Sequence, residues 1–203
     1  MWSAEMLRAR FSLADLPWQP EPLEERFFKD RDPADAAVLI PLVRRPDDLY
    51  VLLTLRTAHL NDHAGQISFP GGRCEAEDGN PIETALRETV EETGLAREYI
   101  EVLGTMPVYQ TATNFMVTPV VALVEPGFTL DPDDFEVEEV FEVPLSFLMN
   151  VENHQQRSLH TPMGERTFYA MPYLSPENGK NYFIWGATAA MLRNLYHFLS
   201  ARA

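Results

Sequence analysis

The sequence has one cysteine, few basic residues and no long apolar run. Because Cys74 is the only cysteine among 203 residues, an intramolecular disulfide and a cysteine-rich zinc site are both excluded. No apolar run reaches the roughly 18 to 20 residues that span a membrane, and residues 1–18 lack the apolar centre of a signal peptide. We therefore expect a soluble, cytoplasmic protein with no membrane partner.

The shortage of basic residues gives a formal net charge of −15, from 16 lysines and arginines against 31 aspartates and glutamates. Such a charge repels a nucleic-acid backbone, so no nucleic-acid partner is expected. If the substrate is a polyanion, a cation must mediate its binding, and a divalent metal held by carboxylates is the obvious candidate. The alternative is that the charge only keeps the protein soluble.

The length and composition indicate one domain. Apolar residues make up 45% of the chain, which is enough for one substantial core, while the chain is too short for two typical domains. Residues 1–34 are rich in proline and charge, and we interpret them as a helix near Glu5 to Phe11 followed by an extended arm packed on the domain. Residues 35–203 are expected to form the domain itself.

Strand-like and helix-like patterns alternate along residues 35–203. Turn residues at 45–48 predict a hairpin between the first two strands, and a final hairpin is predicted with its turn at 177–180. We interpret the acidic stretch 131–144 as a loop that leads into a short helix at 144–149, and the last helix follows from Gly186. Interleaved helices and hairpins indicate an α/β (α+β) fold with a mixed sheet between helices. The predicted strands are 36–43, 49–56, 100–109, 115–124, 167–174 and 181–185.

A further helix is predicted shortly after the glycine pair Gly71 and Gly72. Asn80 suits its N-cap and Pro81 its first position, Glu83 is placed for a capping box, and the helix should end at Gly94. At 100° per residue, one face of this helix can pack on the sheet. The residues on that face are Ile82, Ala85, Leu86, Thr89, Val90 and Thr93.

Three glutamates, Glu88, Glu91 and Glu92, fall on a narrow arc on the opposite side of this helix. Their mutual repulsion costs about a few tenths of a kcal/mol per pair, and Mg²⁺ or Mn²⁺ would offset that cost, since both favour carboxylate oxygens. Arg87 lies four residues before Glu91 and can orient its carboxylate. The alternative is a solvated helix face with one surface salt bridge.

The stretch 72–95, GRCEAEDGNPIETALRETVEETGL, resembles the Nudix box, whose form is G-x5-E-x7-R-E-U-x-E-E-x-G-U, with U bulky and apolar. The half from Arg87 onward matches closely, although Thr89 is a poor first U. In the other half, Asp78 stands where the family has glutamate, and eight residues rather than seven separate it from Arg87. The longer loop and the upstream run 52–72 are similar to the coenzyme A diphosphatase subfamily.

The resemblance implies a Nudix fold, an α/β/α sandwich around a mixed sheet. It also implies Mg²⁺ or Mn²⁺ as the cofactor, with Glu88 and Glu92 as principal ligands and Glu91 as a third or water-mediated one. Arg87 would orient these glutamates. The implied reaction is attack of water on a phosphorus of a nucleoside diphosphate linkage. For coenzyme A the products would be adenosine 3′,5′-bisphosphate and 4′-phosphopantetheine.

The general base of this family lies either on the helix, where Glu91 is available, or on a later loop. The run 136–144 looks like a stretch of the coenzyme A subfamily, which favours Glu139 and then Glu136 as the base. The alternative is a charged loop with no catalytic part.

Four further residues are predicted to contact the substrate. Arg56 can bind a phosphate through its guanidinium fork, although a surface arginine beside acidic neighbours is the alternative. His63 is expected to contact substrate, whereas a metal site made of His59 and His63 is not favoured. Gly71 and Gly72 allow close approach of the backbone to a ligand.

Two departures bear on specificity. Asn61 stands where the subfamily often has arginine, and Thr57 where it has serine or alanine; loss of a cation there would weaken recognition of a 3′-phosphate. Other candidate substrates are ADP-ribose, nucleoside triphosphates and dinucleotides. A catalytically silent Nudix domain that binds a nucleotide or a partner protein is an alternative of another class. The expected partner is a small-molecule nucleotide, and the protein is expected to be a monomer or a homodimer.

Overall fold

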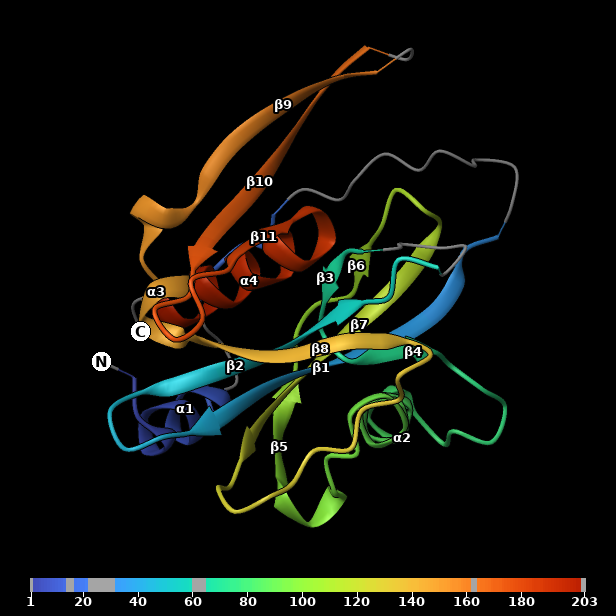
Figure 1. The fold of residues 1–203 in the computed structure, drawn as a ribbon, viewed down its shortest axis with the longest axis vertical. Helices are drawn as coiled ribbons and strands as arrows, with labels where there is room; N and C mark the ends of the chain where they lie inside the picture. The colour runs from blue at the N-terminus through green and yellow to red at the C-terminus, as the bar shows by residue number, and fades with distance from the viewer. Residues whose placement is uncertain (1, 14–16, 22–31, 60–64, 162–163, 202–203) are drawn as a thin grey trace.

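The computed structural model describes residues 2–13, 17–21, 32–59, 65–161 and 164–201. Within them, eight strands form one mixed sheet (Figure 1), in which five strands follow the order β3-β2-β1-β7-β5, while β4 pairs with β1, β6 with β7 and β8 with β2. The strands of this sheet are β1 (Ala34–Arg44), β2 (Leu49–Arg56), β3 (Ile67–Ser68), β4 (Gly71–Arg73), β5 (Ile100–Thr105), β6 (Tyr109–Gln110), β7 (Phe115–Val124) and β8 (Val137–Pro144).

A second sheet has the order β11-β10-β9, and four α-helices and two short 3₁₀ helices complete the described elements. The strands of the second sheet are β9 (Gln155–Thr161), β10 (Gly164–Leu174) and β11 (Asn181–Trp185). The helices are α1 (Ala4–Phe11), α2 (Pro81–Thr93), η1 (Arg97–Tyr99), α3 (Leu145–Leu148), η2 (Val151–Asn153) and α4 (Gly186–Ser200). Among the described residues, no helix is long and apolar enough to cross a membrane.

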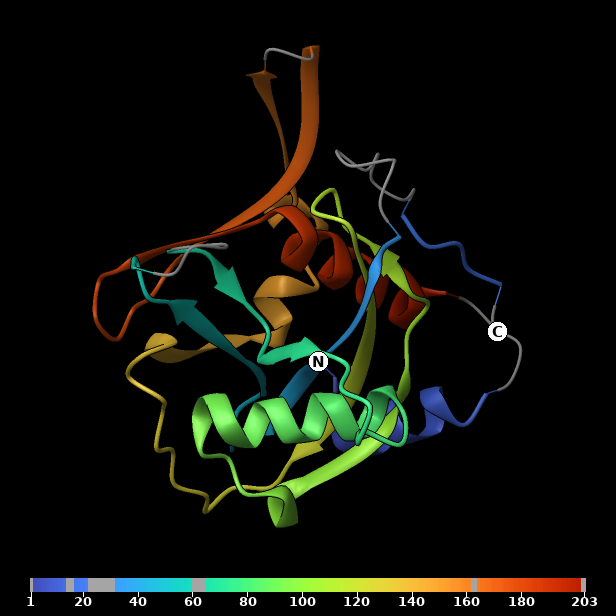
Figure 2. The same cartoon turned by 90° about the vertical axis from the view of Figure 1, so that its right-hand side faces the viewer.

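The centre of the main sheet is the parallel pair β1 and β7, and helices cover both of its faces (Figure 2). Ile40 and Leu42 of β1 lie in one core with residues of α1 and α4. Ala37 and Leu39 lie in the other core, with Ala85 of α2. Because successive strand residues point to opposite faces, one apolar strand supplies both cores. The predicted mixed sheet between helices is therefore confirmed.

Several predicted elements are confirmed. The turn at 45–48 joins β1 to β2, with the amide of Arg45 donating to the carbonyl of Asp48 at 3.0 Å. The final hairpin pairs β10 with β11, and the last helix begins at Gly186. The division into residues 1–34 and 35–203 stays a prediction.

Two parts of the second half of the chain were predicted wrongly. The acidic stretch 131–144 is not loop throughout, because residues 137–144 form β8, paired antiparallel with β2. Its residues Val137, Phe141 and Val143 are buried and Val140 packs in a separate apolar cluster, so the apolar residues of the stretch outweigh its acidic composition. Strand β9 was not predicted at all. Its sequence, QQRSLHT, has only one large apolar residue, and the strand is defined by pairing with β10.

The N-terminal segment is attached to the domain by burial and by ion pairs. Ala4 and Leu7 of α1 are buried in the larger core. Arg8 forms a two-pronged ion pair with Glu101 of β5, with distances of 2.8 and 2.6 Å. Further along, the carboxylate of Glu21 accepts a hydrogen bond from Arg193 of α4 at 2.7 Å. These contacts connect the N-terminal segment to the larger core, to β5 and to α4.

We expect Gly94→Ala to lower the free energy of unfolding by roughly 1–3 kcal/mol, because Gly94 has φ 69° and an added Cβ would lie 2.6 Å from the backbone nitrogen of Asp131. Urea unfolding measures the change. Gly79→Ala is the matched control at the other end of α2, since no atom lies within 4 Å of an added Cβ there. Equal stability of the two variants would contradict the explanation.

Candidate active site

Helix α2 starts and ends where its capping residues predict. The side chain of Asn80 accepts hydrogen bonds from the amides of Ile82 at 2.9 Å and Glu83 at 3.2 Å. Gly94 ends the helix in the left-handed conformation. Only half of the capping box forms, because the carboxylate of Glu83 pairs with Arg97 at 2.7 Å instead of returning to the N-cap.

The two faces of α2 differ from the prediction at two positions. Val90 was placed on the sheet-facing side, yet it is 39% exposed, and Glu92 was placed on the opposite arc, yet it is only 3% exposed. The burial of Glu92 comes from loops that helical periodicity does not describe. The amide of Gly71 donates to its carboxylate, and the amide of Asp133 donates to its main-chain carbonyl at 3.1 Å. The segments that contain Gly71 and Asp133 therefore both contact α2 at Glu92.

Glu92 is a buried carboxylate with two partners. One oxygen accepts from Nη1 of Arg56 and the other from the amide of Gly71, each at 3.1 Å. Burial raises the pKa of Glu92 to about 7, although the Gly71 amide and Arg56 act in the opposite direction, and the charges of Glu136 and Glu88 raise it further. Arg56 thus compensates this carboxylate only in part, and a second cation would be stabilised here.

Glu88 lies one turn before Glu92 and against the glycine pair. A Cβ on Gly72 would stand 2.5 Å from the Glu88 carboxylate, so only glycine leaves room for that group. Burial raises the pKa of Glu88, Arg87 lowers it, and the nearby charges of Glu91 and Glu136 raise it again. Gly72 was predicted to allow close approach of the backbone to a ligand. In the structure, the group that lies close to Gly72 is the carboxylate of Glu88, which is itself a predicted metal ligand.

Arg87 connects the glutamates to Asp78. Its Nε and Nη2 bind the two oxygens of Asp78 at 2.9 and 2.8 Å, while its Nη1 donates to both Glu88 and Glu91 at 3.0 Å. Arg87 holds the pKa of Asp78 well below its usual range, and Asp78 in turn raises the pKa of Arg87. Thr84 also donates to Asp78 at 2.8 Å. No role was predicted for Asp78, which anchors Arg87 in the structure.

The two acidic candidates for the general base lie in different places. Nη2 of Arg56 lies 3.7 Å from the carboxylate of Glu136, whose side chain is 42% exposed. Glu139 instead accepts from the hydroxyl of Tyr182 at 2.7 Å and from Nζ of Lys180 at 2.8 Å. Burial opposes the effect of these two partners, but together they lower the pKa of Glu139.

The preference for Glu139 over Glu136 as the general base stays a prediction, but the two side chains have different surroundings. Glu139 shares a strand face with Phe141, whose ring stacks on Tyr182 at 3.8 Å, so its side chain points toward the second sheet. Glu136 precedes β8 and lies with Arg56 and the glutamates of α2.

The other predicted contact residues are only partly described. His63 and Asn61 lie outside the described residues. His59 is exposed and its ring lies 4.8 Å from that of Phe135. Thr57 is buried and donates through its hydroxyl to the carbonyl of Phe135 at 2.8 Å. Thr57 thus joins the end of β2 to the acidic loop.

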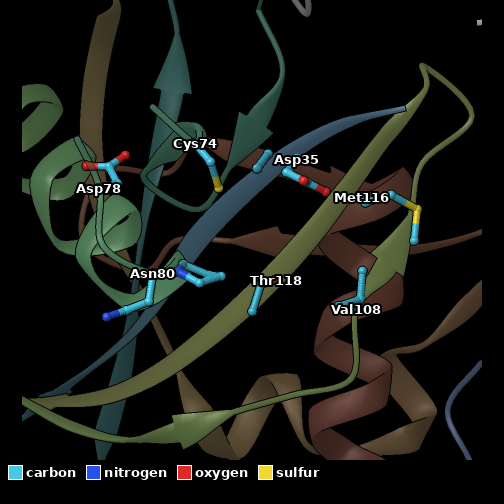
Figure 3. A pocket seen from close by; sticks show the side chains of 9 residues that line it. Asp35, Cys74, Asp78, Asn80, Val108, Met116 and Thr118 are labelled. Carbon is cyan, nitrogen blue, oxygen red and sulfur yellow. The ribbon is translucent and has the colours of Figure 1, made fainter. Parts of the chain in front are cut away.

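A cavity of about 430 Å³ lies at the N-terminal end of α2. Figure 3 shows Asp78 toward one end of it and Met116 and Val108 toward the other. None of the described residues that line it is lysine or arginine, so the cavity does not suit a diphosphate. It adjoins the candidate site through Asp78, whose carboxylate is already bound by Arg87.

The donor chemistry of the glutamate cluster fits Mg²⁺ or Mn²⁺, since carboxylate oxygens are the ligands that these ions favour. In the described part of the chain, however, no three His, Cys, Asp or Glu side chains are grouped as a ready metal site. The arginines explain this arrangement, because Arg56 holds Glu92 while Arg87 holds Glu88 and Glu91. A metal would have to replace some of these ion pairs.

Comparisons with known proteins identify the family of the chain. A family model of the NUDIX domain matches residues 33–162. Proteins named uncharacterized Nudix hydrolase NudL, from Cronobacter sakazakii and Salmonella paratyphi B, are 38% identical to the chain over 160 residues, which cover 79% of this chain and 80% of each relative. A solved Nudix hydrolase from M. smegmatis, RenU, is 24% identical with a TM-score of 0.49, over 57% of this chain and 73% of that one.

The chain belongs to the Nudix family. Its mixed sheet between helices is the Nudix fold, and the protein is a hydrolase that acts on phosphorus anhydrides.

In metal-free protein, we expect Glu92→Gln to be more stable than the wild type near pH 8, by roughly 1–3 kcal/mol. A carboxyl with a raised pKa binds its proton more tightly in the folded state. The wild type therefore loses stability as pH rises from the usual glutamate value of 4.5 to about 7. The difference between the proteins should vanish near the lower pH.

Urea unfolding in the presence of a chelator, repeated across this pH range, measures the effect. Glu91→Gln is the matched control on the same helix, because the side chain of Glu91 is 58% exposed and its neutralisation should give no comparable gain in stability near pH 8. A Glu92→Gln variant less stable than the wild type at every pH would contradict the assignment.

Proposed function

We propose that the protein hydrolyses the diphosphate linkage of coenzyme A or a derivative with Mg²⁺ or Mn²⁺, releasing adenosine 3′,5′-bisphosphate and 4′-phosphopantetheine. The observation that carries the hydrolytic part is the buried, partly compensated carboxylate of Glu92, which lies between Arg56 and the Gly71 amide. Because the negative charge of this buried carboxylate is only partly neutralised by Arg56, the site is suited to a cation and to an anion bound to that cation.

The metal would be held by Glu88 and Glu92, with Glu91 as a third or water-mediated ligand. When bound, it polarises phosphoryl oxygens and lowers the pKa of a coordinated water. Arg87 keeps Glu88 and Glu91 in place, and its bidentate pair with Asp78 keeps Arg87 in place. The roles of these residues follow from their contacts: the glutamates bind, while the arginine and the aspartate position them.

Arg56 has two roles in this proposal. Without metal, its guanidinium pairs with Glu92 at 3.1 Å and lies 3.7 Å from Glu136, so it neutralises both carboxylates. Once a divalent cation compensates Glu92, that guanidinium becomes available to a phosphate, for which its planar fork is well suited. The residue that stabilises the metal-free site is thereby the one that binds the substrate.

Glu136 is the proposed general base. It lies close enough to Glu88 and Glu92 for its charge to raise the pKa of both. Its side chain is 42% exposed, which leaves it accessible to water, and it is not fixed by a lysine as Glu139 is.

Support for coenzyme A comes from the loop that carries Asp78. Eight residues separate Asp78 from Arg87, a spacing that is typical of the coenzyme A subfamily. Despite this longer loop, Asp78 is held in place, because it accepts hydrogen bonds from Thr84 and from the amide of Glu75. The longer loop thus retains the acidic anchor of Arg87.

The substrate is tested by turnover of coenzyme A with Mg²⁺ or Mn²⁺, with products separated by chromatography and with ADP-ribose, dinucleotides and nucleoside triphosphates run in parallel. We expect 4′-phosphopantetheine to appear fastest and Glu92→Gln to reduce turnover by about two orders of magnitude or more. If another diphosphate is cleaved and coenzyme A is not, the substrate assignment is rejected. Full activity of Glu92→Gln would reject the metal-ligand assignment.

The base is tested by comparing Glu136→Gln with Glu139→Gln. Loss of a general base costs typically about 10² to 10⁴ in kcat, so we expect such a loss only for Glu136→Gln, together with loss of the acidic limb of the pH–rate profile. Glu139→Gln should keep turnover and instead lose its ion pair with Lys180. The reverse order of the two effects would restore Glu139 as the base.

A further inference from the structure

Strands β9 and β10 form a ribbon that projects from the body of the molecule (Figures 1 and 2). Their antiparallel register runs from Ala170↔Gln155 near the body to Gly164↔Thr161 at the far end. Every residue from Gln155 to His160 is exposed. A two-stranded ribbon is at best marginally stable in water, so a long exposed one indicates a missing contact.

The outer edge of this ribbon is open. Among the described strands, β9 pairs only with β10, so its other edge presents unpaired backbone donors and acceptors. Natural sheets protect such edges with lysine, proline or a bulge. Strand β9 contains neither lysine nor proline, its one arginine is Arg157, and its register with β10 is uninterrupted. The edge can therefore pair with another strand.

The outer face of the second sheet is also apolar. The inner face packs in the larger core through Met171, Tyr173, Tyr182 and Ile184. On the outer face, Phe168 lies edge-on to Trp185, with ring centroids 5.4 Å apart. The other large apolar residues of that face are Leu159, 54% exposed, Leu174, 66% exposed, and Phe183, 42% exposed. A sheet that is apolar on both faces is typical of an interaction surface.

The charge of the ribbon indicates a second copy of this chain as the partner. Residues 155–170 contain two arginines and one glutamate, within a chain whose net charge is −15. Contact between two copies through most other surfaces would bring acidic groups together. Contact through the ribbon avoids this repulsion and brings backbone edges of the same type together.

We propose that the protein forms a homodimer in which β9 pairs antiparallel with β9 of a second copy, across a two-fold axis at Ser158. A two-fold axis makes such pairing antiparallel and self-complementary. Ser158 is the middle residue of β9, so this register uses the whole strand. It joins the two three-stranded sheets into one continuous sheet.

The side chains across this axis are compatible. Arg157 of one copy stands opposite Leu159 of the other, and Gln156 stands opposite His160. The two Leu159 side chains become diagonal neighbours on the outer face, and so do the two Arg157 side chains, which are farther apart there than directly opposed residues would be. An axis moved by one residue to Arg157 would instead place two arginines directly opposite each other, which is unfavourable.

The first test is the oligomeric state of the full chain by size-exclusion chromatography with light scattering. We expect a dimer for the wild type and a monomer for Leu159→Lys, because lysine on an edge strand opposes pairing. Leu174→Lys is the matched control. Leu174 is more exposed than Leu159 and lies on the same face, but beyond the part of β10 that pairs with β9. A monomeric wild type, or a Leu159→Lys dimer, overturns the proposal.

The second test is disulfide cross-linking in a Cys74→Ser background. Directly opposed residues of antiparallel strands have Cα atoms about 4.5–5.5 Å apart, within the range of a disulfide. Ser158→Cys should therefore give covalent dimers on oxidation. Thr167→Cys, which is directly opposite Ser158 within one copy and is also exposed, should not. No cross-link at Ser158, or equal cross-linking of both variants, overturns the register. Neither test involves the catalytic glutamates, so the result is independent of the proposed activity.

Discussion

The burial of the Glu92 carboxylate is the interaction on which the candidate site depends. Arg56 at the end of β2 and the amide of Gly71 at the start of β4 both bind it, so three separate segments converge on one side chain. The ion pair with Arg56 and the hydrogen bond from the Gly71 amide do not fully offset the desolvation of Glu92, in keeping with its raised pKa. The fold therefore retains a desolvation cost at this carboxylate, which either protonation or a bound cation would relieve.

The second anchor of the site is the bidentate pair between Arg87 and Asp78, which is a different kind of interaction. Because Arg87 also binds Glu88 and Glu91, its position decides where two of the three metal-binding candidates lie. Glu92 is held by Arg56 and Gly71 on the sheet side and Glu88 by Arg87, so the two proposed metal ligands are positioned independently. A change at Asp78 should therefore disturb Glu88 and leave Glu92 in place.

The capping residues predicted the two ends of helix α2 correctly, while the burial of individual side chains on it depends on contacts with distant parts of the chain. Asn80, Pro81 and Gly94 act within a few residues, so their effects can be read directly from the sequence. The burial of Glu92 depends on Arg56 and on the loop before β8, which only the folded chain brings close. The resemblance favoured Glu139 as the general base because of its place in a motif. The sequence alone did not indicate that this side chain contacts Tyr182 and Lys180, which lie 41 and more residues away in the chain.

The acidic composition connects the site with the proposed dimer. A chain with a net charge of −15 resists association with itself, while the proposed function of the glutamate cluster requires a cation. These requirements are met in different parts of the fold: the glutamates lie around α2, and the arginine-containing ribbon of β9 and β10 projects from the body. A dimer joined through this ribbon would keep the two acidic sites apart, because the axis passes through Ser158. Association through the ribbon would therefore leave both sites open to substrate.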